Sequence, residues 1–249
     1  MKIPFNYNEK VISEIQEKLK DDSKYYGEYG RQWLSNSDIG HLLNDPRKFR
    51  QPQEETKAML EGRFFHTAML EKDKLDNFTL LDVSSRNTKA YKEYYAEHNK
   101  MALLTQEAHN ILDVVDAMKL NVEMYESIYD DGNKYEVPMV KTIMGLDWKG
   151  KADIVCQDKL IDLKTTSDIN KFKYSARKYN YDSQAYIYQE LFGLPLEFYV
   201  VDKSTFQLGI FKPTEEFLEK GREKVEDAVF IYNTFFSENA VEDINQIII

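Results

Sequence analysis

The sequence predicts a mixed α/β fold in which a central sheet is covered by helices on both faces. The first half of its 249 residues shows apolar side chains at helical spacing, whereas three short strand-like runs lie between residues 134 and 165. Two helical segments, a strand pair and a last helix follow these runs. This order of elements is typical of a sheet with helices packed against it, and the length suits one large domain.

The helices of the first half are indicated by apolar periodicity and by capping residues. Val11, Ile15 and Leu19 share one face of the first helix. Ser37 is the predicted N-cap of a short helix that ends at the Asp-Pro step of residues 45–46. The other helices are expected over residues 8–19, 54–71, 87–99 and 105–120, with a polar loop over 21–30.

The second half alternates strands and helices. Gly145 and Asp158 separate the first three strands, and Gly193 and Pro195 close a pair of helices. Thr214 is the predicted N-cap of the last helix. We expect strands over 134–143, 147–156, 159–165, 196–201 and 205–211, and helices over 170–178, 182–192 and 215–236.

Composition excludes several classes of protein. Hydrophobic residues make up 42% of the chain, and 17 Tyr and 14 Phe are enough for a sizeable core. The single cysteine, Cys156, rules out a disulfide framework, a four-cysteine iron–sulfur cluster and a cysteine-rich zinc site. No apolar run has the length of a membrane span, and residues 1–20 lack the apolar stretch of a signal peptide. We therefore expect a soluble, cytoplasmic protein.

The charge is unevenly distributed along the chain. The 43 acidic and 33 basic residues leave a net charge of −10, which argues against a general polyanion binder. Residues 141–178, however, carry nine Lys/Arg against five Asp. A locally basic stretch in an acidic chain is expected if a nucleic acid approaches one face only.

Two neighbouring strands each carry a carboxylate near the end of an apolar run. Asp162 and Lys164 are two residues apart, so both side chains leave the same face of their strand, and Asp153 can reach that face from the preceding strand. Two carboxylates and a lysine in this arrangement can bind Mg²⁺ or Mn²⁺ and activate a water. The alternative is that the carboxylates are ordinary strand-end acids and the lysine is an exposed ion-pair partner.

Two helices carry further candidates. His66 lies one turn after Gly62 on a largely apolar helix, where a histidine is either a buried core residue or a metal ligand. If His66 is a ligand, the missing side chain of Gly62 would leave room for the sheet or a DNA strand to approach. Tyr181, Gln184 and Tyr188 share one face of a later helix. Taken alone, that face is an ordinary amphipathic one with a polar interruption.

Together these segments resemble the PD-(D/E)xK nuclease superfamily, over about residues 25 to 237. The resemblance rests on Gly62-x-x-x-His66, GKAD at 150–153, IDLKTT at 161–166 and YDSQAYIY at 181–188 in this order. The branch that looks most similar is that of phage-type exonucleases such as the RecE exodeoxyribonuclease VIII nuclease domain. The resemblance implies a restriction-endonuclease-like central mixed sheet flanked by helices, with a helical N-terminal half. Within one nuclease domain we expect a helical part (1–130), a catalytic α/β core (131–237) and a tail (238–249).

The resemblance also implies a role for each matching residue. Asp153 matches the first aspartate of the motif, although Ala152 replaces the proline of the name, and Asp162 and Lys164 match the (D/E)xK pair. The implied metal ligands are His66, Asp153, Asp162, the backbone carbonyl of Leu163 and, by its place on the preceding strand, Glu136. Gln184 and Tyr188 match the Q-x-x-x-Y motif that contacts substrate and supports the site. The candidate DNA-contacting residues are Ser35 and Ser37 of the opening helix, Tyr181, and the basic set Lys171, Lys173, Arg177 and Lys178, each of which can equally be a solvated surface residue.

The implied activity is that of a metal-dependent DNA exonuclease. It would use one or two Mg²⁺ or Mn²⁺ ions and no iron–sulfur cluster, and would degrade linear duplex ends 5′ to 3′ in phage-type recombination. Two alternatives remain open: a structure-specific or nicking endonuclease, and a non-catalytic protein that binds DNA or a partner. A single-strand annealing recombinase is the expected protein partner. Residues 247–249 could serve a contact in a homo-oligomer or complete a sheet edge.

Overall fold

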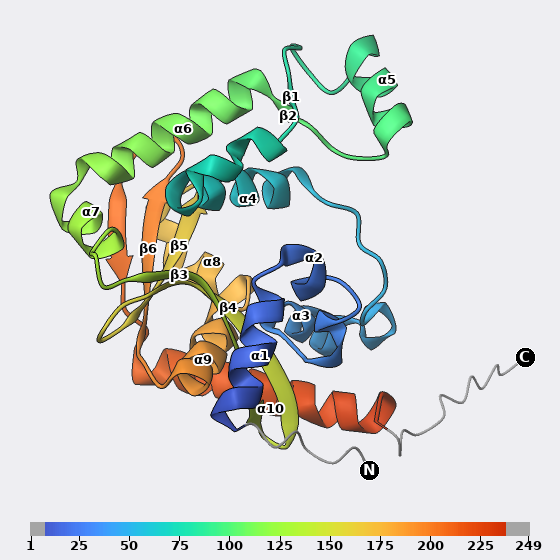
Figure 1. Ribbon diagram of the computed structural model, residues 1–249, viewed down its shortest axis with the longest axis vertical. Helices are drawn as coiled ribbons and strands as arrows, with labels where there is room; N and C mark the ends of the chain where they lie inside the picture. The colour runs from blue at the N-terminus through green and yellow to red at the C-terminus, as the bar shows by residue number, and fades with distance from the viewer. Residues whose placement is uncertain (1–7, 238–249) are drawn as a thin grey trace, which may run out of the picture.

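A five-stranded mixed sheet forms the centre of the computed structural model, which describes residues 8–237 (Figure 1). Its strands lie in sequence order. Of the four neighbouring pairs, β5 with β6 is parallel and the other three are antiparallel. The strands are β3 (Lys134–Ile143), β4 (Leu146–Val155), β5 (Leu160–Thr166), β6 (Leu196–Asp202) and β7 (Leu208–Phe211). The predicted mixed α/β fold is confirmed.

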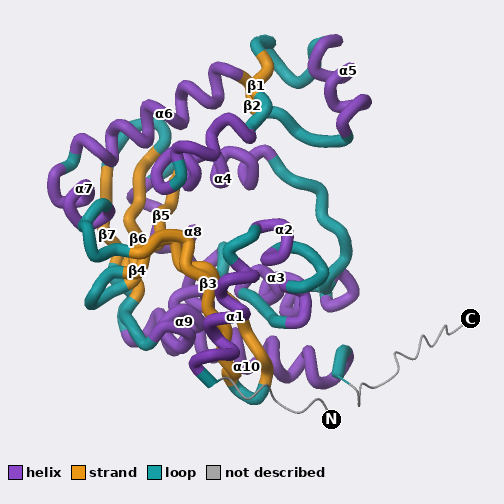
Figure 2. The backbone as a smooth tube through the Cα atoms, viewed as in Figure 1, coloured by secondary structure: helices purple, strands orange, loops and turns teal. Residues whose placement is uncertain are grey.

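Helices cover both faces of this sheet (Figures 1 and 2). Ile161 and Leu163 of β5 face one apolar core, whereas Leu160 of the same strand faces the other, as the two-residue period of a strand requires. The first face is covered by α4 (Lys57–Leu70), α6 (Thr105–Leu120) and α7 (Val122–Ile128). The second is covered by α8 (Phe172–Lys178), α9 (Tyr181–Phe192) and α10 (Glu215–Phe235). None of the described helices is both long and apolar enough to cross a membrane.

The N-terminal helices pack against the far part of the β3–β4 hairpin. Ile15 and Trp33 contact Val140 of β3 in one small core, and Ile39 lies with Trp148 of β4 in another. The backbone of Leu34 also pairs with that of Trp148. The helices concerned are α1 (Glu9–Leu19), α2 (Asp22–Tyr25) and α3 (Asn36–Asn44).

Several local predictions need correction. The N-cap of α3 is Ser35 and not Ser37, because the Ser35 hydroxyl and N–H both donate to Asp38 Oδ2, at 2.9 and 2.8 Å. The expected loop over 21–30 contains α2, and α7 follows directly after α6. The remaining boundaries shift by three residues or fewer. The expected tail at 238–249 lies outside the described residues.

The segment between α4 and α6 forms a small unit of its own. It contains α5 (Lys89–His98) and two short strands, β1 (Leu80–Leu81) and β2 (Leu103–Leu104), which pair in parallel. The sequence analysis did not predict these two strands. Each has only two residues, so neither shows an alternating pattern, and the pairing joins segments more than twenty residues apart.

Candidate active site

The site forms where β4 and β5 separate. These strands pair at Ile154 with Ile161 and at Val155 with Leu160. Beyond these pairs, the Leu163 backbone N–H of β5 donates to the Asp153 side chain of β4, at 2.7 Å from Oδ2. The Asp153 carboxylate thus replaces the backbone acceptor that a paired strand would offer. Asp153 is therefore held between the two strands, with 12% of its side chain exposed.

Asp162 and Lys164 share the face of β5 that is turned toward α9. Lys164 Nζ lies 2.5 Å from Asp162 Oδ2, and only 15% and 4% of the two side chains are exposed. Gln184 Nε2 donates to Asp162 Oδ1 at 2.6 Å. The Lys164 ammonium also lies 4.7 Å from the ring centroid of Tyr181, which is one helical turn before Gln184. Strand and helix thus fix Asp162 from two directions.

His66 and Glu136 approach Asp153 from two other elements. His66 projects from α4, and its Nδ1 lies 3.3 Å from Asp153 Oδ2. Glu136 lies on β3 between the two residues that pair with Ile154 and Ala152, and so opposite Asp153. One ligand atom of each residue lies within 4.8 Å of the other two. The three side chains therefore form one cluster, whether or not His66 serves as a ligand.

The backbone of Glu136 is unusual for a strand. Its φ angle is +49°, in the left-handed region that residues other than glycine seldom adopt. Conformations of this kind cost on the order of 1–3 kcal/mol and concentrate at functional sites. The strain is located where the Glu136 carboxylate meets Asp153.

The electrostatics of the cluster are those of crowded carboxylates. Burial raises the pKa of Asp162 to about 6. The positive charge of Lys164 lowers this pKa and the negative charge of Asp153 raises it, but burial has the largest effect. Burial and the charge of Asp153 raise the pKa of Glu136 to about 7. Burial alone would also raise the pKa of Asp153, but the charge and hydrogen bond of His66 outweigh it and the pKa is lowered. Added positive charge would therefore stabilise the ionised form of each acid.

The residues present fit a divalent cation. Asp162 Oδ2 is buried and has no hydrogen-bond partner among the described residues, although the Lys164 ammonium is beside it. Carboxylate oxygens with one imidazole nitrogen are a donor set that suits Mg²⁺ and still better Mn²⁺. His66, Glu136 and Asp153 form the compact part of this set, and Asp162 lies next to it, turned toward Lys164 and Gln184. Leu163 contributes its N–H to Asp153, and a role for its carbonyl stays a prediction.

Tyr188 supports the strand that carries Asp153. Its hydroxyl donates to the backbone carbonyl of Lys151 at 3.0 Å and accepts from the N–H of the same residue at 3.3 Å. The ring lies so close to β4 that a Cβ on Gly150 would come within 2.2 Å of it. Tyr188 therefore fixes the backbone two residues before Asp153.

Apart from Tyr181, which lies against Lys164, the predicted DNA-contacting residues lie in two places. Lys171 pairs with Asp168 at 2.9 Å and Arg177 with Glu216 at 3.1 Å. Lys173 and Lys178 both belong to the short helix α8. The ammonium of Lys173 lies over the ring of Tyr174 in that helix, and the ammonium of Lys178 lies over the ring of Tyr179 just after its end. Whether any of them contacts DNA stays a prediction.

Ser35 and Ser37 lie apart from this basic group, at the start of α3. The residue between them, Asn36, accepts a hydrogen bond from Ser183 Oγ at 2.6 Å and donates to the Asn180 carbonyl at 3.0 Å. The opening helix is thus attached to the beginning of α9, the helix that carries Gln184.

Two features near the site were missed or only half anticipated from the sequence. Lys151 is two residues before Asp153, so strand alternation could have indicated it. Only 8% of its side chain is exposed; the ammonium pairs with Asp22 of α2, and its charge opposes the rise in the pKa of Glu136. Gly62 was expected to let either the sheet or DNA approach, but apart from the adjoining part of its own helix no described atom would lie within 4 Å of a Cβ there. The sheet is therefore not what approaches Gly62.

The chain is similar to a described protein family and to a solved structure. Residues 40–240 match the family described as a PDDEXK-like domain of unknown function (DUF3799). Among solved structures, a candidate exonuclease from Eubacterium rectale is similar at 18% sequence identity and a TM-score of 0.62, covering 91% of this chain and 95% of its own. The structure of SSO0001 aligns at 16% identity over 70% of this chain and 87% of its own, but its TM-score of 0.33 is too low to indicate a shared fold. No curated protein matches the chain.

Proposed function

Since this chain belongs to the PDDEXK-like family that its residues 40–240 match, we propose that it is a metal-dependent deoxyribonuclease that degrades DNA from free ends. One observation carries the proposal. The Asp153, Asp162 and Lys164 side chains, which have the motif spacing, meet at the point where β4 and β5 separate, and His66 lies beside them. Family membership and fold support a nuclease, and the finer statements below are our own.

A divalent cation would be held by His66, Glu136 and Asp153, with Asp162 adjacent. Bound there, Mg²⁺ or Mn²⁺ would supply positive charge against the negative charge that builds on a phosphodiester during hydrolysis. One or two ions are compatible with this donor set. Because imidazole is a softer ligand than carboxylate, Mn²⁺ should support cleavage at least as well as Mg²⁺.

The side chains of the chain itself would position the reacting groups. The Lys164 ammonium, held by Asp162, can orient an attacking water and offset charge on the phosphate. Gln184 restrains Asp162 through its hydrogen bond, and Tyr188 restrains the backbone of β4. Site geometry maintained in this way is what a hydrolysis that depends on positioning requires.

Action from DNA ends is favoured by two resemblances. The chain shares its fold with a candidate exonuclease, and its motifs resemble those of exodeoxyribonuclease VIII. A 5′ to 3′ polarity, a role in phage-type recombination with an annealing recombinase, and assembly into a homo-oligomer follow from the second resemblance only. An endonuclease on the same core is the first alternative, and a non-catalytic DNA-binding protein is the second. All three charged motif residues, Asp153, Asp162 and Lys164, are present, which argues against the non-catalytic alternative.

Digestion of labelled linear duplex and closed circular DNA, with and without Mg²⁺ or Mn²⁺, tests the proposal. We expect loss of the linear DNA only, and only with metal. In Asp162→Asn the rate should fall by about 100-fold or more, because the substitution removes a charge from the site. Asp158→Asn, which changes an exposed residue of the same β4–β5 turn, is the matched control and should cleave normally. Cleavage of circles would favour the endonuclease, and DNA binding without any cleavage would favour the non-catalytic alternative.

A further inference from the structure

A second candidate site lies on the α8 side of the sheet. A cavity of about 370 Å³, open to solvent on one side, is lined by α8, the neighbouring strands β6 and β7, and the start of α10. This volume falls in the range of about 300–1,000 Å³ that is usual for small-molecule sites. The residues proposed above to bind metal do not line it.

Five of the eleven residues that line the cavity are aromatic. Phe172 and Phe211 lie with their ring centroids 4.5 Å apart, and Phe198 and Phe217 lie 6.4 Å apart. Tyr174, also in the lining, is 63% exposed. Phenylalanine rings next to an exposed tyrosine are suited to bind another aromatic ring, because aromatic side chains stack on nucleobases of any sequence.

The rim of the cavity carries excess positive charge. Lys173 makes no ion pair within the described residues, and its ammonium lies 4.9 Å from the centroid of the Tyr174 ring. Lys212 forms an ion pair with Glu197 at 2.7 Å. Glu197 also pairs with Lys159 at 3.0 Å, so one carboxylate is shared by two ammonium groups. An occupant that combines an aromatic ring with a negative group is therefore favoured over a neutral apolar one.

One ring separates this cavity from the catalytic lysine proposed above. Tyr181 lies between them: the Lys164 ammonium is 4.7 Å from its centroid, and Phe198 stacks against it at 5.7 Å with an interplanar angle of 30°. Tyr181 also contacts Phe172, at 6.0 Å. The aromatic cavity and the candidate active site are thus neighbours.

We propose that the cavity binds one unpaired nucleobase of the strand that is being cut, with the adjoining phosphate at Lys173 and Lys212. This inference rests on the proposed nuclease function and adds the class of substrate. A base can enter an aromatic cavity only when it has left its pairing partner. The substrate is therefore a single strand or a duplex end that has frayed.

Photocrosslinking tests where the base lies. Single-stranded oligonucleotides would carry one 5-iododeoxyuridine at successive positions, and they would be irradiated with the full chain in Ca²⁺. At one position, peptide mass spectrometry should find the crosslink on Tyr174, Phe211 or Phe217. Crosslinks found only on other segments, at every position of the label, would overturn the inference.

Substitution of Tyr174 tests the energetic contribution. Tyr174→Ala should weaken binding of single-stranded DNA by about tenfold, because it removes one stacking partner, whereas Tyr174→Phe should bind as the wild type does. Tyr125→Ala is the control, since Tyr125 is 48% exposed on α7, across the sheet. Equal binding by Tyr174→Ala and the control would contradict the inference. Absence of cleavage by the wild type would instead count against the proposed function, while the crosslink and binding results still decide about the cavity.

Discussion

Lys164 is a residue that we propose acts beside a metal ion without being one of its ligands. Its ammonium is buried beside Asp162 and would repel a cation. We therefore expect Lys164→Ala to lose cleavage by about 100-fold or more while Mn²⁺ binding stays near normal or tightens slightly. Calorimetric titration of the folded variant with Mn²⁺, beside a cleavage assay, provides the check. A folded variant that binds no metal would mean that Lys164 has a different role.

Gly62 and Gly221 differ only in what surrounds them. Both are helical. Apart from the adjoining part of its own helix, a Cβ at Gly62 would meet no described atom within 4 Å, whereas one at Gly221 would lie 2.1 Å from the Asp182 carbonyl oxygen of α9. Gly62→Ala should therefore raise the free energy of unfolding by about 0.5–1 kcal/mol. Gly221→Ala should lower it by about 1–3 kcal/mol, because α9 and α10 must move apart.

Urea unfolding of both variants measures these changes, and each serves as the control for the other. Destabilisation by Gly62→Ala would show that the space near Gly62 is needed by the protein itself. A stabilised Gly62→Ala variant with reduced cleavage would instead support passage of DNA along this side of α4.

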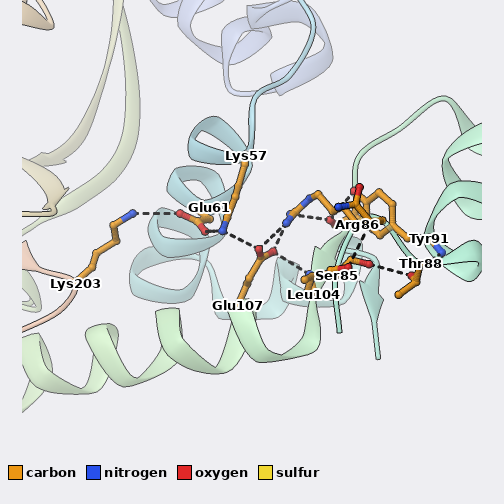
Figure 3. Close-up of polar contacts among 11 residues, drawn as sticks. Lys57, Glu61, Ser85, Arg86, Thr88, Tyr91, Leu104, Glu107 and Lys203 are labelled. Atoms are coloured by element: carbon orange, nitrogen blue, oxygen red, sulfur yellow. Dashed lines mark hydrogen bonds and ion pairs between the residues drawn. The ribbon is translucent and has the colours of Figure 1, made fainter. Parts of the chain in front are cut away.

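Among the elements, α4 needs a firm attachment because it carries His66. Figure 3 shows that attachment as a chain of ion pairs from Lys203 through Glu61, Lys57 and Glu107 to Arg86. Glu107, at the start of α6, is its centre. It accepts from Arg86 Nη2 at 2.7 Å and from the Leu104 N–H at 3.1 Å, and it pairs with Lys57 of α4 at 2.8 Å.

The network makes α4 sensitive to acid. Burial would raise the pKa of Glu107, but hydrogen bonds from Arg86 and Lys57 outweigh it and lower the pKa from 4.5 to about 2. Because the folded-state pKa is the lower one, the stabilisation is complete above about pH 4.5 and is lost as the pH falls through about 2. Glu107→Gln should therefore be less stable than the wild type by about 2–3 kcal/mol at pH 7, and the difference should shrink below pH 4.5.

Urea unfolding of Glu107→Gln and wild type between pH 2 and 7 measures this difference. Glu126→Gln, at an exposed position of α7, is the matched control and should follow the wild type throughout. A stability difference that is independent of pH would show that Glu107 contributes through packing and not through its charge.

At the scale of the whole molecule, the acidic chain places its buried carboxylates where they repel one another. A cation that binds only the folded state should therefore stabilise the protein. Mn²⁺ at about 100 times its dissociation constant is expected to raise the free energy of unfolding by about 2.7 kcal/mol. Thermal or urea unfolding with Mn²⁺ and with excess chelator measures the gain, which should be absent in Asp153→Asn. An equal gain in that variant would place the ion elsewhere.

The sequence by itself determined the mixed α/β order of elements and the superfamily. Helical and strand periodicities express contacts within one turn or along one strand, and for that reason they can be recognised without the fold. The spacing of Asp162 and Lys164 is of the same kind, because two residues along a strand always share a face. Capping was less certain: Ser35 and Ser37 are equally good N-caps by residue type, and the hydrogen bonds to Asp38 decide between them.

Only the tertiary structure decided which residues from distant segments meet. Glu136 lies beside Asp153 through the pairing of β3 with β4, and His66 through the packing of α4 on the sheet. The aromatic cavity is assembled from α8, two strands and α10, none of which would form it alone. Such contacts depend on how the whole chain packs, and local periodicity contains no information about them. The same reason explains why the short parallel pair of β1 and β2 was not predicted.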